Sequence, residues 1–172
     1  MARAVLGGGC FWCVEGAFKE IRGIKSALPG YAGGHDPMPN YNSVCSGITG
    51  HAEVVEIIFD DEIISYETIL NVFFTVHDPT QLNRQGNDIG TQYRSVIYYL
   101  DDKQKLTADK VIDDFQKYFE DEIVTEVSEL SNYHEAEEYH HNYFQLNPGN
   151  GYCRMVVAPK LAKVRQKMSH LY

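Results

Sequence analysis

Four cysteines are the residues of this chain best suited to covalent or redox chemistry, and Cys10 has the most informative surroundings. It follows a run of three glycines, residues 7–9, and the apolar residues after it are spaced as one stripe of a helix. The thiol is therefore expected at a helix N-terminus, where unpaired N–H groups and the helix dipole favour negative charge. This predicts a lowered thiol pKa and a nucleophilic thiolate; a small buried thiol at a helix start is the structural alternative.

Cys13 completes a Cys-x-x-Cys pattern with Cys10, which is typical of a thioredoxin-type redox pair at a helix start. A zinc site would need a second close pair of ligands, and the other two cysteines, Cys45 and Cys153, stand alone in the sequence. The pattern therefore favours nucleophilic or redox chemistry over a zinc site made from these cysteines.

A second cluster of candidate ligands lies in residues 133–146, a polar segment for which the sequence predicts a helix. His134 and His141 would share one face of that helix with a carboxylate between them, an arrangement that suits a metal ion. No further ligand has a matching position, so a solvated polar helix is the favoured interpretation. Further polar residues are dispersed over predicted loops and strand ends: Tyr41, His51, Glu53, Asp88 and Tyr93.

Alternating strands and helices must position these residues. Short apolar and β-branched runs predict strands over residues 3–6, 24–31, 53–59, 95–100 and 123–130. Helical spacing predicts helices that begin at Cys10 and after Ser65, and others over residues 103–119, 133–146 and 160–170.

The order of the first six elements, β-α-β-β-α-β, predicts an α+β fold of the ferredoxin-like, split βαβ type. We expect a two-layer sandwich, a mostly antiparallel sheet with helices packed on it, in a single domain over residues 1–172. Residues 78–94 lack periodicity, which is typical of a long functional loop. The glycine-rich C-terminal segment 147–159 is predicted to be free of helix.

The composition of the chain disfavours some classes of function. The chain has 24 acidic and 15 basic residues, a formal charge of −9, which disfavours binding to nucleic acid or anionic membranes. No apolar run approaches the ~20 residues of a membrane helix, and the N-terminus lacks a secretory pattern. We therefore expect a cytoplasmic protein in which the cysteines do chemistry rather than form structural disulfides.

The sequence resembles the A-type peptide methionine sulfoxide reductases over nearly its whole length and in the family's order. The matching stretches are GCFWCVEGAF at 9–18, GYAGG at 30–34, the segments 39–60 and 64–99, YHEAEEYHHNYF at 133–144 and NPGNGYC at 147–153. The resemblance implies reduction of the S epimer of methionine sulfoxide, free or in proteins, without a metal or organic cofactor. It thus implies a role in repair of oxidised proteins.

The resemblance also gives roles to individual residues. Cys10 would attack the sulfoxide sulfur, and Phe11 and Trp12 would form the apolar wall that receives the substrate methyl group. Glu53 would protonate or hydrogen-bond the sulfoxide oxygen. Two tyrosines and one aspartate would complete the polar side of the pocket: Tyr41 and Tyr93 would hold the same oxygen, and Asp88 would help to order water.

Attack by Cys10 would leave a sulfenic acid, which condenses with a second thiol to a disulfide. Cys153, in the family's C-terminal GYC, would be that resolving thiol, with thioredoxin as the reductant and a monomer as the acting form. Many family members have glycine where this chain has Cys13, so Cys13 is an alternative resolving thiol. Cys45 is interpreted as structural.

Two other function classes compete with the reductase. One is a metal hydrolase that uses His134 and His141 on the predicted polar helix. The other is a non-enzymatic redox sensor in which Cys10 acts only as a switch. Tight stoichiometric metal would favour the first, and absence of catalytic turnover would favour the second.

Overall fold

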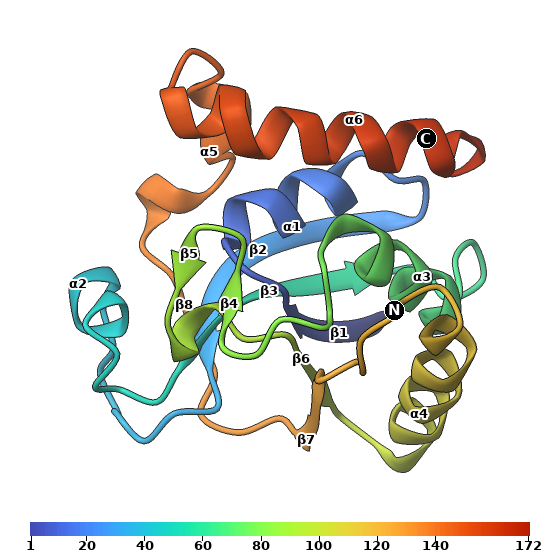
Figure 1. Ribbon diagram of the computed structural model, residues 1–172, viewed down its shortest axis with the longest axis horizontal. Helices are drawn as coiled ribbons and strands as arrows, with labels where there is room; N and C mark the ends of the chain where they lie inside the picture. The colour runs from blue at the N-terminus through green and yellow to red at the C-terminus, as the bar shows by residue number, and fades with distance from the viewer.

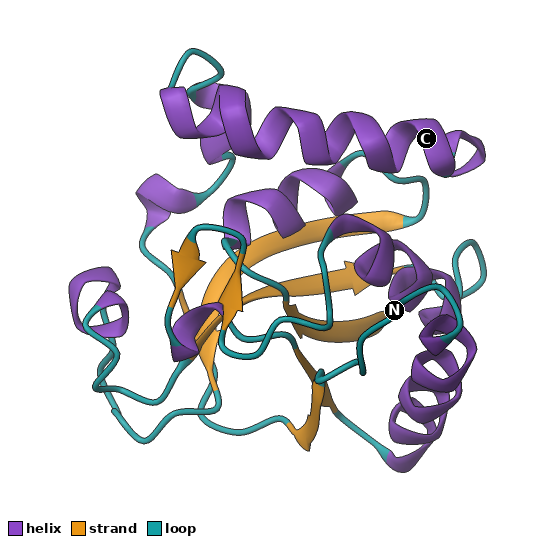
Figure 2. Ribbon diagram, in the orientation of Figure 1, coloured by secondary structure: helices purple, strands orange, loops and turns teal.

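The computed structural model describes all 172 residues and contains a six-stranded sheet with its long helices packed on one face (Figures 1 and 2). The strands lie in the order β7-β6-β1-β3-β2-β8, and every neighbouring pair is antiparallel except β6 and β7. Their bounds are β1 (Ala2–Gly7), β2 (Ile24–Ala32), β3 (Ala52–Phe59), β6 (Val96–Tyr99), β7 (Glu126–Glu129) and β8 (His134–Glu135).

Four long helices cover the sheet: α1 (Phe11–Lys19), α3 (Tyr66–Val76), α4 (Asp102–Gln116) and α6 (Ala158–Lys167). Strand β3 lies between β1 and β2, which α1 connects, so these elements form the split βαβ unit that the sequence predicts. Figure 1 shows α6 running over α1, with which it is in contact, so the C-terminal helix forms an outer cover. No helix is long and apolar enough to cross a bilayer.

The alternation of side chains along β3 decides which face each residue serves. Val55, Ile57 and Phe59 point into the main core beneath the helices, whereas Ala52 and Val54 belong to a smaller apolar cluster on the other face. Since successive side chains on a strand point to opposite faces, residue 53 shares the helix-facing side with residues 55 and 57. This register places a carboxyl group under the helices rather than in solvent.

The loops between these elements contain short structures that the sequence did not indicate. Helix α2 (Tyr41–Cys45) begins with a capping box in which Asn40 and Ser43 exchange hydrogen bonds. The aperiodic segment 78–94 contains a small hairpin, β4 (Arg84–Gln85) and β5 (Asp88–Ile89), followed by the 3₁₀ turn η1 (Thr91–Tyr93). The predicted N-cap Ser65 is confirmed, because its side chain accepts a hydrogen bond from the backbone of Thr68.

The predicted polar helix over residues 133–146 is wrong. The segment forms strand β8, the 3₁₀ turn η2 (Glu138–His140) and the short helix α5 (Tyr143–Leu146). Pairing with the edge of β2 holds its first part extended, and Asn142, at φ 59°, interrupts the chain before α5. Hydrogen bonds to distant parts of the chain thus outweigh a sequence that favours a helix.

The predicted absence of helix in residues 147–159 is also wrong. A π-helical turn, η3 (Cys153–Val157), leads directly into α6, which ends near the 3₁₀ turn η4 (Ser169–Leu171). The predicted helix over residues 160–170 therefore begins several residues earlier. Only residues 147–151, between α5 and η3, keep the exposed, glycine-rich character of a loop.

A buried acid ties α1 to this C-terminal segment. Glu15 is 1% exposed, and its Oε2 accepts a hydrogen bond of 3.0 Å from the backbone N–H of Asn142. Its other oxygen has no partner, and burial raises the pKa of Glu15 to about 7. The folded protein therefore holds a proton at Glu15 in a pH range where an unfolded glutamate has lost it.

This difference predicts how pH affects stability. Between pH ~4.3 and 7 the native state binds more protons at Glu15 than the unfolded state, so the free energy of unfolding falls as pH rises. Glu15→Gln keeps an oxygen for Asn142 but cannot ionise. Its stability relative to the wild type is expected to rise by about 3 kcal/mol from pH 4 to pH 8, measured by urea denaturation. An equal stability difference at both pH values would contradict the raised pKa.

Candidate active site

Cys10 stands at the N-cap of α1, and its side chain makes no capping hydrogen bond, so the thiol is free for chemistry. Gly9 before it has φ +88°, and a Cβ there would lie 2.8 Å from the side chain of Gln85. Only glycine allows this turn and this close approach. The residue is buried, with 7% of its surface exposed.

Glu53 lies beneath the same helix start. Its Oε1 accepts a hydrogen bond of 3.2 Å from the backbone N–H of Phe11, while Oε2 is buried without a partner. Burial raises the pKa of Glu53 to about 8; the N–H of Phe11 opposes this rise, and the charges of Asp88 and Cys13 add to it. At neutral pH the group is therefore a protonated acid with one oxygen directed to no protein partner.

The thiol pKa differs from the sequence prediction. Burial raises the pKa of Cys10, and the thiol of Cys13 and the charge of Glu53 raise it further, against the opposing effect of the Trp12 backbone N–H. The predicted lowering is therefore wrong, because burial of the thiol outweighs the N–H groups of the first turn, one of which serves Glu53. The hydrogen bond between the two thiols lowers the pKa of Cys13, so the pair shares its protons.

Two tyrosines approach Glu53 from separate loops, Tyr41 at the start of α2 and Tyr93 at the end of η1. Burial and then the charge of Glu53 raise the pKa of both phenols, so both keep their O–H donors. Cys45 lies beside them, and hydrogen bonds from both hydroxyls oppose the rise in its pKa that burial causes. Cys45 thus borders the site.

Asp88 reaches the site from β5, where its Oδ2 accepts a hydrogen bond from the hydroxyl of Tyr152. Burial and then the charges of Cys10 and Cys13 raise the pKa of Tyr152, so this ring adjoins the reactive thiols. Tyr152 had no distinguishing signal among the 12 tyrosines of the sequence.

Phe11 and Trp12 form an aromatic wall beside the thiol. Phe11 is buried, with its ring 6.4 Å from that of Tyr41 and nearly parallel to it. Trp12 is half-buried and stacks on Tyr143, with 3.9 Å between the ring centroids and 7° between the planes. The site therefore combines a thiol, a neutral acid, two phenols and an apolar wall.

Comparison with known proteins decides the family. A family model described as peptide methionine sulfoxide reductase matches residues 2–171. A relative named peptide methionine sulfoxide reductase MsrA, from Chromobacterium violaceum, is 52% identical over 99% of this chain and 98% of its own. Another of that name, from Natronomonas pharaonis, is 54% identical over 96% of this chain and 94% of its own. This chain belongs to the A-type peptide methionine sulfoxide reductase family.

Solved structures of this family share the fold. Mxr1 from Saccharomyces cerevisiae in reduced form gives a TM-score of 0.84 at 32% identity, covering 88% of each chain. Methionine sulfoxide reductase A of Corynebacterium diphtheriae gives 0.81 at 35% identity, covering 85% of this chain and 74% of the other. The α+β architecture predicted from the order of strands and helices is therefore confirmed.

The two thiols that the family resemblance suggests could resolve the sulfenic acid, Cys13 and Cys153, lie in different parts of the structure. Cys13 is on the first turn of α1, where it hydrogen-bonds Cys10. Cys153 is completely buried at the start of η3, and charge on Cys13 contributes to raising its pKa after burial. Cys13 therefore hydrogen-bonds one of the other two thiols and acts on the second through its charge.

Glu137 lies in the polar segment 133–146, where the sequence suggested a carboxylate between two histidine ligands, but its role in the structure is different. Its two carboxylate oxygens accept hydrogen bonds from the hydroxyl of Tyr31, at 2.8 Å, and from the backbone N–H of Tyr41, at 2.9 Å. Although burial raises the pKa of Glu137, these hydrogen bonds lower it overall, so the group remains a carboxylate. It fixes the start of α2 and thereby the position of Tyr41. The erroneous prediction of a polar helix concealed this role.

The structure changes two interpretations of histidines made from the sequence, that of His51 and that of the pair His134 and His141. His51 lies outside the site, because its ring accepts from the backbone N–H of Gly34 and contacts the carbonyl of Asp36, which shapes the preceding loop. His134 lies in β8 and His141 follows η2, so they do not share a helix face as the hydrolase alternative requires. No three His, Cys, Asp or Glu side chains in the structure gather as ligands for a metal ion.

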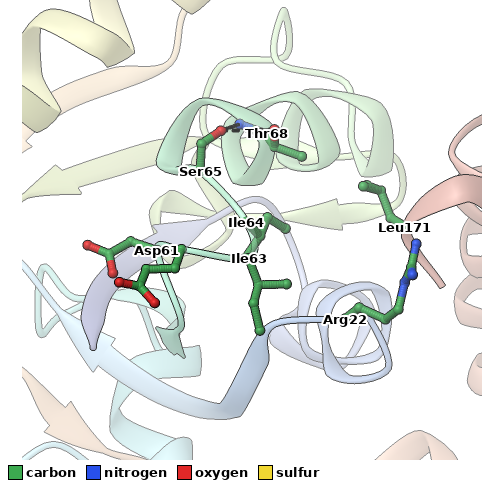
Figure 3. Close-up of a pocket in the computed structure, with 8 residues that line it drawn as sticks. Arg22, Asp61, Ile63, Ile64, Ser65, Thr68 and Leu171 are labelled. Atoms are coloured by element: carbon green, nitrogen blue, oxygen red, sulfur yellow. Dashed lines mark hydrogen bonds between the residues drawn. The ribbon is translucent and has the colours of Figure 1, made fainter.

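The pocket drawn in Figure 3 is separate from this chemistry. It has a volume of about 520 Å³ and is lined by residues that include Arg22, Asp61 and Thr68. Arg22 follows the C-terminal end of α1, whereas Cys10 caps its N-terminus, more than ten ångströms away at about 1.5 Å per residue. None of the cavities in the structure is lined by Cys10, whose residue surface is 7% exposed.

Proposed function

We propose that this chain reduces the S epimer of methionine sulfoxide, free or in proteins, to methionine, with Cys10 as nucleophile and Glu53 as acid. One observation carries the proposal: a buried carboxyl with pKa about 8 is held by the N–H of Phe11 immediately beside the thiol of Cys10. A sulfoxide needs this pair, because its sulfur is electrophilic but its oxygen leaves sulfur only when protonated.

The substrate would occupy the space between the polar and apolar sides of the site. The S-methyl group would pack on Phe11 and Trp12, and the oxygen would face Glu53 and the hydroxyls of Tyr41 and Tyr93. Phenol donors fixed in a dry site stabilise an oxygen that gains charge, each by about 2–4 kcal/mol when preorganised. Asp88, which Tyr152 holds, would order the polar side and its water.

The reaction transfers one oxygen atom from substrate sulfur to Cys10. The sulfur of Cys10 forms a bond to the sulfoxide sulfur, while the oxygen takes one proton from Glu53 and the thiol proton of Cys10, so the S–O bond breaks and water is released. This water then attacks the sulfur of Cys10 and breaks the S–S bond, so methionine leaves, Cys10 becomes a sulfenic acid and one proton returns to Glu53. Protonated Glu53 also removes the negative charge that raises the pKa of Cys10, so protonation of the acid assists formation of the thiolate.

We propose that Cys13 resolves the sulfenic acid first. Cys13 hydrogen-bonds the thiol of Cys10 at the same helix start, so the two sulfur atoms meet in one part of the site, and a small shift of the helix start would bring the Cβ atoms to the ~3.5–4.5 Å of a disulfide. Condensation releases water and forms a Cys10–Cys13 disulfide. Cys153 then attacks the Cys13 sulfur and frees Cys10 as a thiolate. The sequence predicted Cys153 as the thiol that resolves the sulfenic acid directly, whereas this proposal gives that step to Cys13 and the second step to Cys153.

A dithiol protein would complete the cycle by reducing the last disulfide. Mxr1 of Saccharomyces cerevisiae is known in complex with Trx2, which supports a thioredoxin as this partner. Cys153 follows closely on the exposed residues 145–151, which offer an approach for such a reductant. We further propose that the chain acts as a monomer of one domain in the cytoplasm, where thioredoxin is kept reduced.

The nucleophile is tested by Cys10→Ser. A serine hydroxyl does not attack the sulfoxide sulfur, so release of methionine from S-methionine sulfoxide with dithiothreitol should fall at least a thousandfold, with the circular dichroism spectrum unchanged. Chromatographic assay of methionine gives the rate. Retained turnover would remove Cys10 as nucleophile. A wild-type protein that forms a sulfenic acid with peroxide but never turns over a sulfoxide would instead be the redox sensor.

The acid is tested by the pH profile of Glu53→Gln. In the wild type, kcat/KM should be level below pH 8 and fall above it, because deprotonation of Glu53 both removes the acid and raises the pKa of Cys10. Glutamine keeps an acceptor for Phe11 but donates no proton, so kcat should fall about a hundredfold or more. The fall above pH 8 should disappear. An unchanged profile would exclude Glu53 as the acid.

The order of the thiols is tested by Cys13→Ser and Cys153→Ser, each mixed once with excess substrate and no reductant. Cys153→Ser should release one methionine per chain and stop with a Cys10–Cys13 disulfide, as seen by peptide mass spectrometry. Cys13→Ser should accumulate the sulfenic acid, because in the proposed order Cys153 reacts with Cys13 rather than with Cys10. Rapid formation of a Cys10–Cys153 disulfide in Cys13→Ser would show that Cys153 resolves directly. Cys45→Ser is the control that should leave all disulfides unchanged.

A further inference from the structure

His140 makes a contact that the proposed reaction has not yet used. It lies in η2, is 1% exposed, and its Nδ1 is 3.2 Å from the indole Nε1 of Trp12. An indole N–H only donates, so Nδ1 must be an unprotonated acceptor, and the imidazole is neutral with its proton on Nε2. Burial lowers the pKa of His140, which agrees with the neutral form.

The imidazole also touches the rest of the aromatic wall. Its centroid is 4.9 Å from the ring of Phe11 and 4.5 Å from the ring of Tyr41, while Nε2 is buried without a partner. His140 therefore contacts three of the four aromatic residues assigned to the substrate pocket.

Trp12 is fixed from a second direction by the same segment. Tyr143, three residues after His140, stacks on the indole with centroids 3.9 Å apart, and Asn142 between them is anchored to Glu15. A stacking partner alone lets an indole rotate in its plane, whereas a hydrogen bond at Nε1 fixes that rotation. The indole edge that faces the substrate is thus set by His140.

We propose that His140 is a positioning residue that holds the Trp12 indole and thereby sets the selectivity of the pocket for a methyl group on the sulfoxide sulfur. The inference rests on the proposed function, and it deepens that function by naming what limits the substrate class. A rigid wall should reject the S-ethyl analogue, ethionine sulfoxide, since one additional methylene in a fitted pocket changes kcat/KM about 10–200-fold.

The test compares His140→Phe with His140→Asn on methionine and ethionine sulfoxides. Phenylalanine keeps a ring but leaves the indole N–H unpaired, so KM for methionine sulfoxide should rise about tenfold while kcat changes less than threefold. The methyl-over-ethyl ratio of kcat/KM should fall about tenfold. Asparagine keeps an acceptor and should restore KM and selectivity to within threefold of the wild type. The exposed His170→Phe is the matched control and should match the wild type throughout.

Trp12 is the only tryptophan of the chain, so its fluorescence reports the indole directly. His140→Phe should shift the emission maximum and increase quenching by acrylamide, and His140→Asn should not. If His140→Phe does not fold, His140→Leu removes the acceptor with a smaller side chain and should show the same loss of selectivity.

The possible outcomes distinguish a failure of this inference from a failure of the proposed function on which it rests. A wild type without turnover refutes the proposed function, and the fluorescence comparison then decides the positioning role by itself. A wild type that turns over, with unchanged selectivity and unchanged emission in His140→Phe, overturns the positioning role and leaves the reductase intact. Equal losses in His140→Phe and His140→Asn would also overturn it, because a hydrogen-bond acceptor would then be irrelevant.

Discussion

The hydrogen bond from the backbone N–H of Phe11 to Glu53 is the contact on which the site depends, because it joins the start of α1 to β3 at the reacting centre. The first turn of a helix has only a few free backbone N–H groups. Here the carboxyl of Glu53 interacts with the N–H of Phe11, and the thiol of Cys10 interacts with the neighbouring N–H of Trp12. Raising a carboxyl pKa from 4.5 to about 8 corresponds to about 5 kcal/mol against ionisation. Burial therefore keeps an acid protonated beside a thiol, and the same burial keeps that thiol from ionising freely.

That arrangement depends on the register of one strand. Glu53 faces the helices because it is two residues from Val55 and four from Ile57, both of which are core residues. A shift of one residue would turn the carboxyl to the opposite face and bring Val54 beneath Cys10. The β-branched residues of β3 thus hold the acid in place as well as forming the core.

The sequence predicted the regular part of the fold and the centre of the site, but not the segments that enclose it. Strong periodicity gave α1, β3 and α3, and Ser65 marked a helix start. Residues 133–146 were misassigned because distant partners decide their shape: Glu137 bonds Tyr31 and Tyr41, and His140 bonds Trp12. A local pattern contains no information about such partners. The raised pKa of Cys10 escaped prediction for a similar reason, since burial follows from packing rather than from position at a helix start.

The misassigned segment matters because it joins two parts of the proposed reaction. Through His140 and Tyr143 it holds the aromatic wall, and the residues that follow it, Tyr152 and Cys153, bring a third phenol and a third thiol to the site. Cys153 is wholly buried and next to Tyr152, whose hydroxyl bonds Asp88. In the proposed cycle, a dithiol partner can therefore reach Cys153 only if the chain moves beside the residue that orders the polar side of the pocket. Access of the reductant and order in the pocket would thus depend on the same short segment.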